Sequence, residues 1–385
     1  MPPYDAFLLV SFGGPEGPED VIPFLRNVTR GRAVPPERLE HVAEHYYRFG
    51  GVSPINQQCR DLLGLIEKDF AATGIDLPVY WGNRNWAPYL ADTVRAMAAD
   101  GVQRAIAFVT SAYSSYSSCR QYLDDIELAR AQAGAGAPQI DKIRPYFNHP
   151  GFIEPLAAST RRAVQALPAS VQDDAQLVFT AHSIPAVMAA ASGPGGSGAY
   201  PAQLAEAARL VAERAGGSRP WRLAYQSRSG PPSQPWLGPD VSECLTELSR
   251  AGAPAVVLVP VGFVSDHMEV RYDLDVEAAE TARRLGLPLA RAATPGTSPG
   301  FVTMITELVT ERLVTERLGA KQVSAAPAAA LGRLGPLPDI CPAGCCAASV
   351  SPAASAATPG GAASPRGAAS PGGAATRAAR AGGAQ

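Results

Sequence analysis

The stretch Ala255-Val-Val-Leu-Val-Pro-Val261, followed by Gly-Phe-Val-Ser-Asp-His267, sets the fold class of this chain. A short apolar run that ends in a polar loop is typical of a strand buried on both faces of a parallel sheet. The run Arg104–Thr110, which leads into Ser-Ala-Tyr113, repeats the pattern. We therefore expect two parallel sheets, each with a binding loop at the carboxyl end of a strand.

Working outward, four more short apolar runs read as strands, with longer amphipathic stretches between them. The further predicted strands are Ala6–Ser11, Pro78–Trp81, Gln176–Thr180 and Arg222–Gln226. The predicted helices are Asn56–Ala72, Tyr89–Ala99, Gln203–Ala215, Val241–Ala251, Val276–Leu285 and Phe301–Leu318. This alternation predicts an α/β fold of two Rossmann-like, doubly wound domains, residues 1–150 and 151–322, that face a cleft.

Residues 323–385 form a tail made mostly of Ala, Pro, Gly and Ser. Such a composition buries too little apolar surface to offset the entropy of ordering, so the tail is expected to be disordered. It nevertheless carries three of the six cysteines, namely Cys341, Cys345 and Cys346.

The formal net charge is −2, and no basic block points to nucleic acid. The apolar run Ala6–Val10 is too short for a membrane span or a secretion signal. We expect a cytoplasmic protein with no membrane span. In that compartment the cysteines are thiols or metal ligands rather than disulfides.

His182 is the first catalytic candidate, because it lies between the predicted strand Gln176–Thr180 and the helix-stopping Pro185. A hydrogen-bonded structural histidine is the alternative. Glu269, Asp273 and Glu277 are the second candidates, since their spacing of four places them on one face of a helix. A solvated acidic face is the alternative here. Because the row begins just after a predicted buried strand, its first carboxylate should reach the cleft and serve a divalent cation or departing protons.

The glycine-rich stretch Ser11-Phe-Gly-Gly-Pro-Glu-Gly-Pro18 lacks the Lys-Ser/Thr of a phosphate loop and the third glycine of a dinucleotide fingerprint. We interpret it as a tight turn that brings backbone, and the ring of Phe12, against a flat ligand. A plain strand-to-helix turn is the alternative. Arginine forks, a phenol and a hydroxyl that suit ligand carboxylates follow, at Arg30, Arg32, Tyr46 and Ser53. An ordinary solvated loop would look the same.

Taken together, these segments resemble the ferrochelatase family over about Ala6–Leu318. The resemblance is carried by six ordered stretches: Leu-Val-Ser-Phe-Gly-Gly-Pro at Phe12, Tyr-Arg-Phe-Gly-Gly-Val-Ser-Pro-Ile at Ser53, Gly-Asn-Arg-Asn-Trp-Ala-Pro-Tyr at Gly82, Thr-Ala-His-Ser-Ile-Pro at His182, Tyr-Gln-Ser-Arg-Ser-Gly with Pro-Trp-Leu-Gly-Pro at Gln226, and Val-Pro-Val-Gly-Phe-Val-Ser-Asp-His-Met-Glu at Glu269. The family fold, two Rossmann-like domains around a porphyrin cleft, agrees with the pattern of predicted elements.

The resemblance implies insertion of Fe²⁺ into a porphyrin, with release of two protons. It implies that His182 and Glu269 face each other across the macrocycle and bind the iron substrate. It also implies that Asp273 and Glu277 continue an acidic row, on a distorted helix, that carries protons or metal. Residues around the propionates are implied to be Arg30, Arg32, Tyr46 and Ser53. The composition and the cysteine pattern of the tail are similar to those of actinobacterial members, which implies coproporphyrin III as substrate and coprohaem as product. We expect the protein to be a monomer.

Three departures from the family pattern bear on metal binding. Phe12 stands where some members carry a tyrosine, and Ala112 where some carry a histidine. The tail cysteines resemble those of members that hold a [2Fe-2S] cluster, which implies ligands at Cys119, Cys341, Cys345 and Cys346. Idle thiols in a disordered tail are the alternative, because adjacent cysteines strain a shared cluster.

Two other functions fit the same sequence pattern. A two-domain tetrapyrrole or haem carrier would bind between α/β lobes without turnover and would not need an acidic row beside the histidine. A cobalt or nickel chelatase for another tetrapyrrole would share the fold and the histidine. Protoporphyrin IX is the alternative porphyrin.

Overall fold

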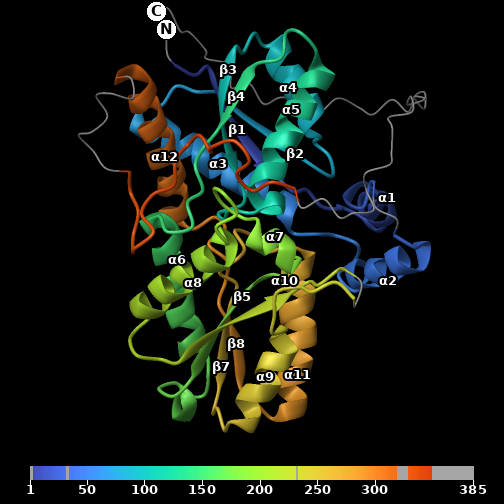
Figure 1. Ribbon diagram of the computed structural model, residues 1–385, viewed down its shortest axis with the longest axis vertical. Coiled ribbons are helices and arrows are strands. Elements are labelled where there is room, and N and C mark those ends of the chain that lie inside the picture. The colour runs from blue at the N-terminus through green and yellow to red at the C-terminus, as the bar shows by residue number, and fades with distance from the viewer. Residues whose placement is uncertain (1–2, 32–33, 231–232, 319–327, 349–385) are drawn as a thin grey trace, which may run out of the picture. The chain divides into compact units, whose positions relative to one another are not determined.

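Figure 1 shows the computed structural model, which describes residues 3–31, 34–230, 233–318 and 328–348. These residues contain two sheets of four parallel strands. The first sheet has the order β2-β1-β3-β4 and consists of β1 (Ala6–Ser11), β2 (Val79–Asn83), β3 (Arg104–Val109) and β4 (Gln139–Lys142). The second has the order β6-β5-β7-β8 and consists of β5 (Gln176–His182), β6 (Trp221–Gln226), β7 (Val256–Val259) and β8 (Leu289–Arg291). The predicted α/β fold with two parallel sheets is confirmed.

The central strands are the ones that the sequence identifies best. Every residue of β1 and of β7 is buried, as expected for apolar runs covered on both faces of a parallel sheet. The edge strands β4 and β8 were not predicted. Their sequences, Gln-Ile-Asp-Lys and Leu-Ala-Arg, are short and partly polar, so that pairing with a neighbour rather than local pattern makes them strands.

Helices connect the strands and cover the sheets. They are α1 (Pro18–Val28), α2 (Pro36–Tyr47), α3 (Ile55–Thr73), α4 (Leu90–Ala99), η1 (Tyr116–Arg120), α5 (Gln121–Ala133), α6 (Pro150–Gln165), η2 (Ala169–Val171), α7 (Ala186–Ala190), α8 (Ala199–Arg214), α9 (Val241–Arg250), α10 (Met268–Tyr272), η3 (Asp273–Ala278), α11 (Ala279–Leu285) and α12 (Pro299–Leu318). No helix within the described ranges is long and apolar enough to cross a bilayer.

Helix α6 was missed by the sequence analysis because Gly151 and Pro155 argue against a helix. Burial of Phe152, Ile153 and Leu156 overrides that propensity. The last helix, α12, packs against both α3 and α6. Its Phe301 ring lies 6.0 Å from that of Phe108 in the first sheet, so the chain returns to the first half after completing the second. The predicted domain boundaries at residues 150 and 322 stay a prediction.

Residues 328–348, near the start of the predicted tail, lie against the folded body. Leu331 N–H donates to Asn148 O at 2.8 Å, and Arg333 N–H donates to Glu206 Oε1 at 2.6 Å. Gly332 has φ +77°, which strains any residue with a side chain, and a Cβ there would fall 2.1 Å from Glu206 Oε1 and displace that carboxylate. The disorder expected for the rest of the tail concerns residues 323–327 and 349–385, which lie outside the described residues.

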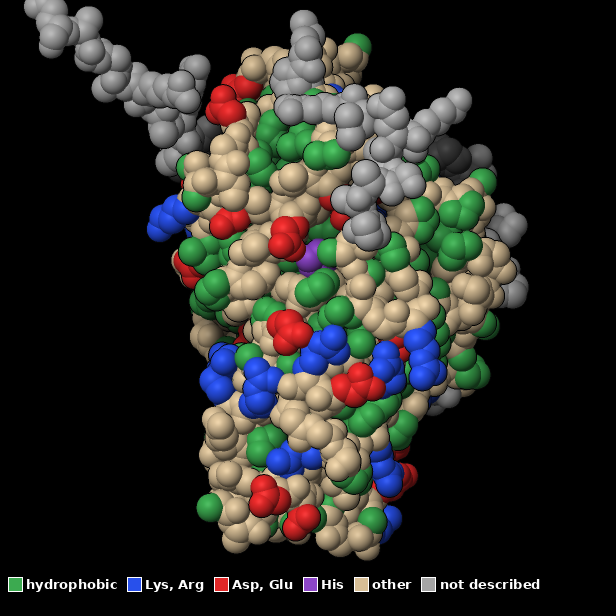
Figure 2. Space-filling model, turned by 90° about the vertical axis from the view of Figure 1, so that its left-hand side faces the viewer, with side chains coloured by type: hydrophobic (Ala, Val, Ile, Leu, Met, Phe, Trp, Pro, Cys, Tyr) green, Lys and Arg blue, Asp and Glu red, His purple; other side chains and the backbone are tan. Residues whose placement is uncertain are grey.

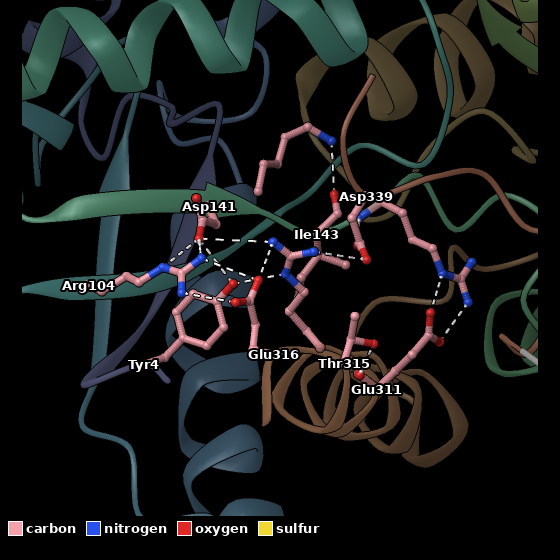
Figure 3. A network of polar contacts seen from close by, with 11 residues as sticks. Tyr4, Arg104, Asp141, Ile143, Glu311, Thr315, Glu316 and Asp339 are labelled. Carbon is pink, nitrogen blue, oxygen red and sulfur yellow. Dashed lines mark hydrogen bonds and ion pairs between the residues drawn. The ribbon is translucent and has the colours of Figure 1, made fainter. Parts of the chain in front are cut away.

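Asp339 fastens the same segment at a second place. Its carboxylate accepts a hydrogen bond from Arg144 N at 3.2 Å and pairs with the Arg312 guanidinium at 3.2 Å. Figure 3 shows Asp339 within a network that includes Tyr4, Arg104, Asp141 and Glu316. This anchoring fixes the chain two residues before Cys341.

Charged side chains of both signs are intermingled on the face drawn in Figure 2. Two arginines of α8 lie next to acidic side chains and form ion pairs with them. Arg209 pairs with Glu213, and Arg214 pairs with Glu154 at 2.7 Å.

Candidate active site

The site is organised around His182 and Glu269, which come from different elements of the second half. His182 is the last residue of β5, and its Nδ1 lies 2.5 Å from Ser183 O. Its Nε2 lies 3.6 Å from Glu269 Oε2, at the start of α10. The two side chains are 34% and 46% exposed, so both can be reached from solvent.

Each member of this pair changes the pKa of the other. Burial disfavours a charged His182, but the Glu269 carboxylate outweighs it and raises the pKa of the imidazole. Burial likewise disfavours a charged Glu269, but His182 and then His267 lower the pKa of that carboxyl to about 2. The pair therefore stabilises a proton on His182 beside a negatively charged Glu269.

His267 is a site residue that the sequence analysis did not single out. Its Nδ1 lies 3.8 Å from Glu269 Oε2, and its ring packs 5.2 Å from that of Phe263. Burial lowers the pKa of His267. The sequence feature that could have identified His267 is its position in the loop after β7, two residues before Glu269. From there its imidazole can approach the same carboxylate that His182 contacts.

The acidic row does not lie on a regular α-helix. Glu269 belongs to α10, whereas Asp273 and Glu277 belong to η3, a π-helix that continues into α11. Wide turns of this kind are rare and often occur at functional sites. The structure thus agrees with the distorted helix that the resemblance implied.

Asp273 is the member of the row best suited to exchange protons. Burial raises the pKa of its carboxyl to about 7, the Ser227 hydrogen bond acts against that rise, and the negative charges of Glu269 and Glu277 add to it. Ser227 Oγ donates to Asp273 Oδ2 at 2.5 Å, and Gln226 Nε2 donates to the same oxygen at 3.3 Å. A carboxyl group that titrates near pH 7 can both accept and release protons.

Gln226 and Ser227 were quoted in the sequence analysis only as part of a matching stretch. Gln226 pairs in register with His182 at the ends of β6 and β5, and its Nε2 also donates to Glu269 O at 3.0 Å. Ser227 has a left-handed backbone, with φ +60°, which a non-glycine residue adopts at a cost. The two residues therefore tie the strand ends to the acidic row.

Glu277 lies at the outer end of the row and is exposed. Burial, followed by the negative charges of Asp240 and Glu280, raises the pKa of its carboxyl. The three predicted carboxylates thus run from the partner of His182 out to the surface.

The first half supplies an aromatic wall, formed by Phe24 of α1, Tyr46 of α2, and Phe12 and Trp86 from the loops after β1 and β2. Their rings pack edge to face, with centroids 6.3 Å apart for Phe12 and Phe24 and 5.9 Å for Phe24 and Tyr46. Tyr46 is buried, and burial, together with the charges of Glu269 and Asp273, raises the pKa of its phenol well above the usual value. The wall therefore stands close to the acidic row contributed by the second half.

The glycine turn after β1 is packed against protein. Gly13 has φ +82°, and a Cβ on it would lie 2.9 Å from Asn83 Cβ. A Cβ on Gly14 would lie 2.7 Å from the Cβ of Ser53, which is buried. Internal packing is therefore sufficient to require both glycines, and it places the Ser53 hydroxyl behind the turn that carries Phe12.

Arg30 lies apart from the histidine. It donates to Asn27 Oδ1 at 2.6 Å and lines a pocket of about 330 Å³ with Arg84, Arg95 and Tyr89. Neither His182 nor Glu269 lines that pocket. The predicted role of Arg32 falls on a residue outside the described part of the chain.

Four cysteines meet at a second place, as two pairs of thiols. Cys119, in η1, shares a hydrogen bond with Cys341. The Sγ atoms of Cys345 and Cys346 lie 3.8 Å apart, and Gly193 N–H donates to Cys346 Sγ at 3.2 Å. The hydrogen bond from Cys341 lowers the pKa of the Cys119 thiol to about 6 against the opposing effect of burial, with Lys142 adding to the lowering.

The remaining two cysteines, Cys59 and Cys244, lie apart from these four and are less readily deprotonated than Cys119. Cys59 and Cys244 are buried in the cores, and burial raises the pKa of the Cys59 thiol to about 11. Within the described ranges, no group of three or more His, Cys, Asp or Glu side chains is arranged to hold a metal ion. The four thiols are thus arranged as pairs and not around one centre.

Comparison with known proteins places this geometry in a family. A model described as ferrochelatase matches residues 4–313. A Streptomyces coelicolor protein named coproporphyrin III ferrochelatase is 55% identical, over 90% of this chain and 94% of its own length. A Nocardia farcinica protein of the same name is 53% identical, over 91% and 98%, and a Rhodopirellula baltica protein named ferrochelatase is 54% identical, over 90% and 94%. With a matched fold and a histidine–carboxylate site in place, the chain belongs to the ferrochelatase family.

Proposed function

We propose that this protein inserts Fe²⁺ into coproporphyrin III to give coprohaem. The observation that carries the proposal is the line from His182 to Glu269 to Asp273, in which Glu269 touches the imidazole and Asp273 titrates near pH 7. Relatives that match more than nine-tenths of their own length bear the name coproporphyrin III ferrochelatase.

The reaction exchanges two pyrrole N–H protons for one Fe²⁺, so two protons must leave the ring as the iron–nitrogen bonds form. Gripping and puckering the ring exposes the nitrogen lone pairs, with the strain offset by contacts to the peripheral carboxylates. His182 accepts a proton from the ring, and Glu269 stabilises the imidazolium that results. Asp273 takes protons onward, and the exposed Glu277 releases them to solvent.

The choice of coproporphyrin III rests on carboxylate recognition and on the names of the relatives. Coproporphyrin III carries four propionates, and protoporphyrin IX carries two. The candidate donors for the additional carboxylates are Arg30, Arg32, Tyr46 and Ser53, of which Tyr46 and Ser53 are buried in this structure. Arginine in particular suits a planar carboxylate because it can donate two parallel hydrogen bonds.

A turnover assay tests the proposed reaction. Fe²⁺ and Co²⁺ are each offered with coproporphyrin III, protoporphyrin IX and sirohydrochlorin, and metalloporphyrin formation is followed by absorbance. We expect the fastest insertion with Fe²⁺ and coproporphyrin III. Equal or faster insertion into protoporphyrin IX would overturn the substrate, and fast Co²⁺ insertion into sirohydrochlorin would favour the chelatase alternative. Tight binding without turnover would identify a carrier instead.

We also propose that Cys119, Cys341, Cys345 and Cys346 hold a [2Fe-2S] cluster. Such clusters use four thiolates, two on each iron, and the chain brings four thiols together as two pairs. The low pKa of Cys119 favours the thiolate that iron requires. Anchoring of residues 328–348 through Glu206 and Asp339 supports the proposal, because it delivers the tail cysteines to Cys119.

The cluster is tested on anaerobically purified protein. Wild type should be brown and contain inorganic sulfide, and both features should be lost in Cys119→Ser and Cys341→Ser. Cys244→Ser, a buried cysteine of the second sheet region, is the matched control and should stay coloured. A colourless wild type without sulfide refutes the cluster, whereas full colour in Cys119→Ser refutes only that ligand.

The proposal includes a monomer that works in the cytoplasm. The predicted monomer is tested by light scattering at assay concentration, where the mass should be close to 40.0 kDa. Fractionation of the producing cells tests the compartment. A stable dimer, or recovery outside the cytoplasmic fraction, would contradict these two parts alone.

A further inference from the structure

Arg291 links the loop after β7 to the distorted helix that carries the acidic row. It is the last residue of β8, an edge strand of the second sheet (Figure 1), and its side chain is 17% exposed. Its Nε and Nη2 donate to the two carboxylate oxygens of Asp275 at 2.5 and 3.1 Å. Its Nη1 and Nη2 donate to the two oxygens of Asp266 at 3.2 and 3.0 Å. One guanidinium thus makes two bidentate ion pairs, which its planar fork of donors allows and a lysine ammonium does not.

The two carboxylates that Arg291 joins enclose part of the site in the sequence. Asp266 lies in the loop three residues before Glu269, and Asp275 lies within η3. Glu269 and Asp273, the first two carboxylates of the acidic row, therefore belong to a segment that Arg291 contacts at both ends. The position of this segment depends on a residue that is itself outside the row.

Other contacts fix each end of the segment separately. Asp266 N–H donates to Gln58 Oε1 of α3 at 3.0 Å, and Thr294 Oγ1 donates to Asp266 Oδ1 at 3.1 Å. On the helix, Arg271 Nε lies 2.9 Å from Asp275 Oδ2. Each of these contacts involves one of the two carboxylates, whereas Arg291 binds both and so couples the loop to η3.

The wide turn of η3 decides which side chains of the segment share a face. Successive residues are about 100° apart around an α-helix of 3.6 residues per turn, so losing the extra residue of a π turn rotates everything beyond it by that amount. Asp266 and Asp275 are 15% and 28% exposed, and both contact Arg291 Nη2. Without that cation the two carboxylates would repel each other, which favours a rearrangement of the loop and the helix.

We propose that Arg291 is a positioning residue for metal insertion: by bridging Asp266 and Asp275 it maintains the wide turn of η3 and holds the acidic row against His182. The inference rests on the proposed function. Arg291 contacts neither His182 nor the row in the structure, and it acts on the reaction through the two carboxylates that it binds.

Arg222 provides a matched control. It lies on β6, the other edge strand of the second sheet, and also pairs with a helical carboxylate, since its Nη1 is 3.1 Å from Glu247 Oε2 of α9. Both side chains are about half exposed, at 46% and 57%. An exposed pair of this kind contributes little, so its loss should leave the site unchanged. Comparison of the two arginines separates the bridge from a general effect of removing a strand arginine.

The experiment compares wild type with Arg291→Gln, Arg291→Lys, Asp275→Asn, the double variant Arg291→Gln/Asp275→Asn, and Arg222→Gln. Initial rates of Fe²⁺ insertion into coproporphyrin III give kcat and KM, expressed per folded molecule from circular dichroism and urea unfolding. Hydrogen–deuterium exchange of peptides that cover residues 268–278 reports, without any turnover, how firmly α10 and η3 are held.

We expect Arg291→Gln to lower kcat by about 10- to 100-fold, the effect of a small misplacement of reacting groups, with a KM for the porphyrin near wild type. Amide exchange in residues 268–278 should become faster. Arg291→Lys should fall between the two, because it keeps the charge without the fork. Adding Asp275→Asn to Arg291→Gln should cost no further activity, since the pair is already broken. Arg222→Gln should match wild type in all three measurements.

A folded Arg291→Gln protein with wild-type kcat and wild-type exchange would overturn the role of Arg291 and leave the proposed function standing. Lower stability with an unchanged kcat per folded molecule would also overturn it, because Arg291 would then be structural only. Full additivity in the double variant would overturn the bridge to Asp275. If Arg291→Gln does not fold, Arg291→Lys and Asp275→Asn decide in the same way. A wild type that inserts no iron would overturn the proposed function, and the exchange data would still test the hold on η3.

Discussion

The two sheets repeat one topology but use it differently. In each, the strand that comes first in the chain lies between the second and the third, and the fourth occupies an edge. The last register pair of the first two strands is Ser11 with Asn83 in the first sheet, and His182 with Gln226 in the second. The same place in the fold therefore carries a hydroxyl and an amide in one half and an imidazole and an amide in the other.

The difference lies in what surrounds each pair. Ser11 and Asn83 are fully buried and hydrogen-bonded to each other, while Trp81 Nε1 donates to Ser11 Oγ at 2.9 Å. His182 instead remains one-third exposed and faces a carboxylate. The comparison shows that the same strand end can hold either a packing residue or a catalytic candidate. The residues that lie opposite the strand end decide which of the two it holds.

The largest effect should come from removing the imidazole. His182→Ala is expected to fold and to lose metal insertion by about 10²–10⁴-fold, the usual contribution of a general base. The matched control is Ser11→Ala, the equivalent strand end in the first sheet. Steady-state insertion rates decide the matter, and near-native turnover in His182→Ala would remove the residue from the mechanism.

The acidic row should show graded effects. Glu269→Gln removes the direct partner of His182 and should be severely impaired, Asp273→Asn should be milder, and the exposed Glu277→Gln milder still. Distance from the reacting ring sets this order, because only the first carboxylate contacts the imidazole. If Glu277→Gln were the most damaged of the three in kcat, the row would have another purpose, such as holding a structural cation.

The pH dependence should report the His182–Glu269 pair. His182 accepts a proton only when neutral, and Glu269 raises its pKa, so kcat/KM should increase with pH through a midpoint above the ordinary value of about 6.5. In Glu269→Gln the burial that lowers the pKa is less opposed, and the midpoint should move to lower pH. Asp273→Asn should move it less. An unchanged midpoint in Glu269→Gln would show that another group controls the profile.

The smallest effect on insertion is expected for the structural pair. Ser11→Ala removes the hydrogen-bond partner of Trp81 Nε1 and of Asn83 Oδ1, which should cost about 1–3 kcal/mol of unfolding free energy. Urea unfolding measures the loss. Insertion by the folded variant should stay near wild type, and a defect as large as that of His182→Ala would erase the distinction between the two sheets.

Much of this architecture could be predicted because its signal is local. Apolar runs such as β1 and β7 are buried in the sheets, His182 ends the strand β5, and Glu269 follows β7 after a loop. The edge strands β4 and β8 lack such a signal and depend on neighbours. Helix α6 was not predicted because its glycine and proline have low helix propensity. Burial of its apolar residues in the core stabilises the helix more than this low propensity destabilises it.

The sequence by itself determined the parallel α/β pattern, the histidine at a strand end and the spacing of the acidic row. Only the tertiary structure decided that Ser227 hydrogen-bonds Asp273 and that His267 lies beside the carboxylate of Glu269. The physical reason is the distance along the chain over which each kind of interaction acts. Hydrophobic periodicity acts between residues a few positions apart, whereas pKa values and ligand sets depend on side chains that meet only after distant segments have packed.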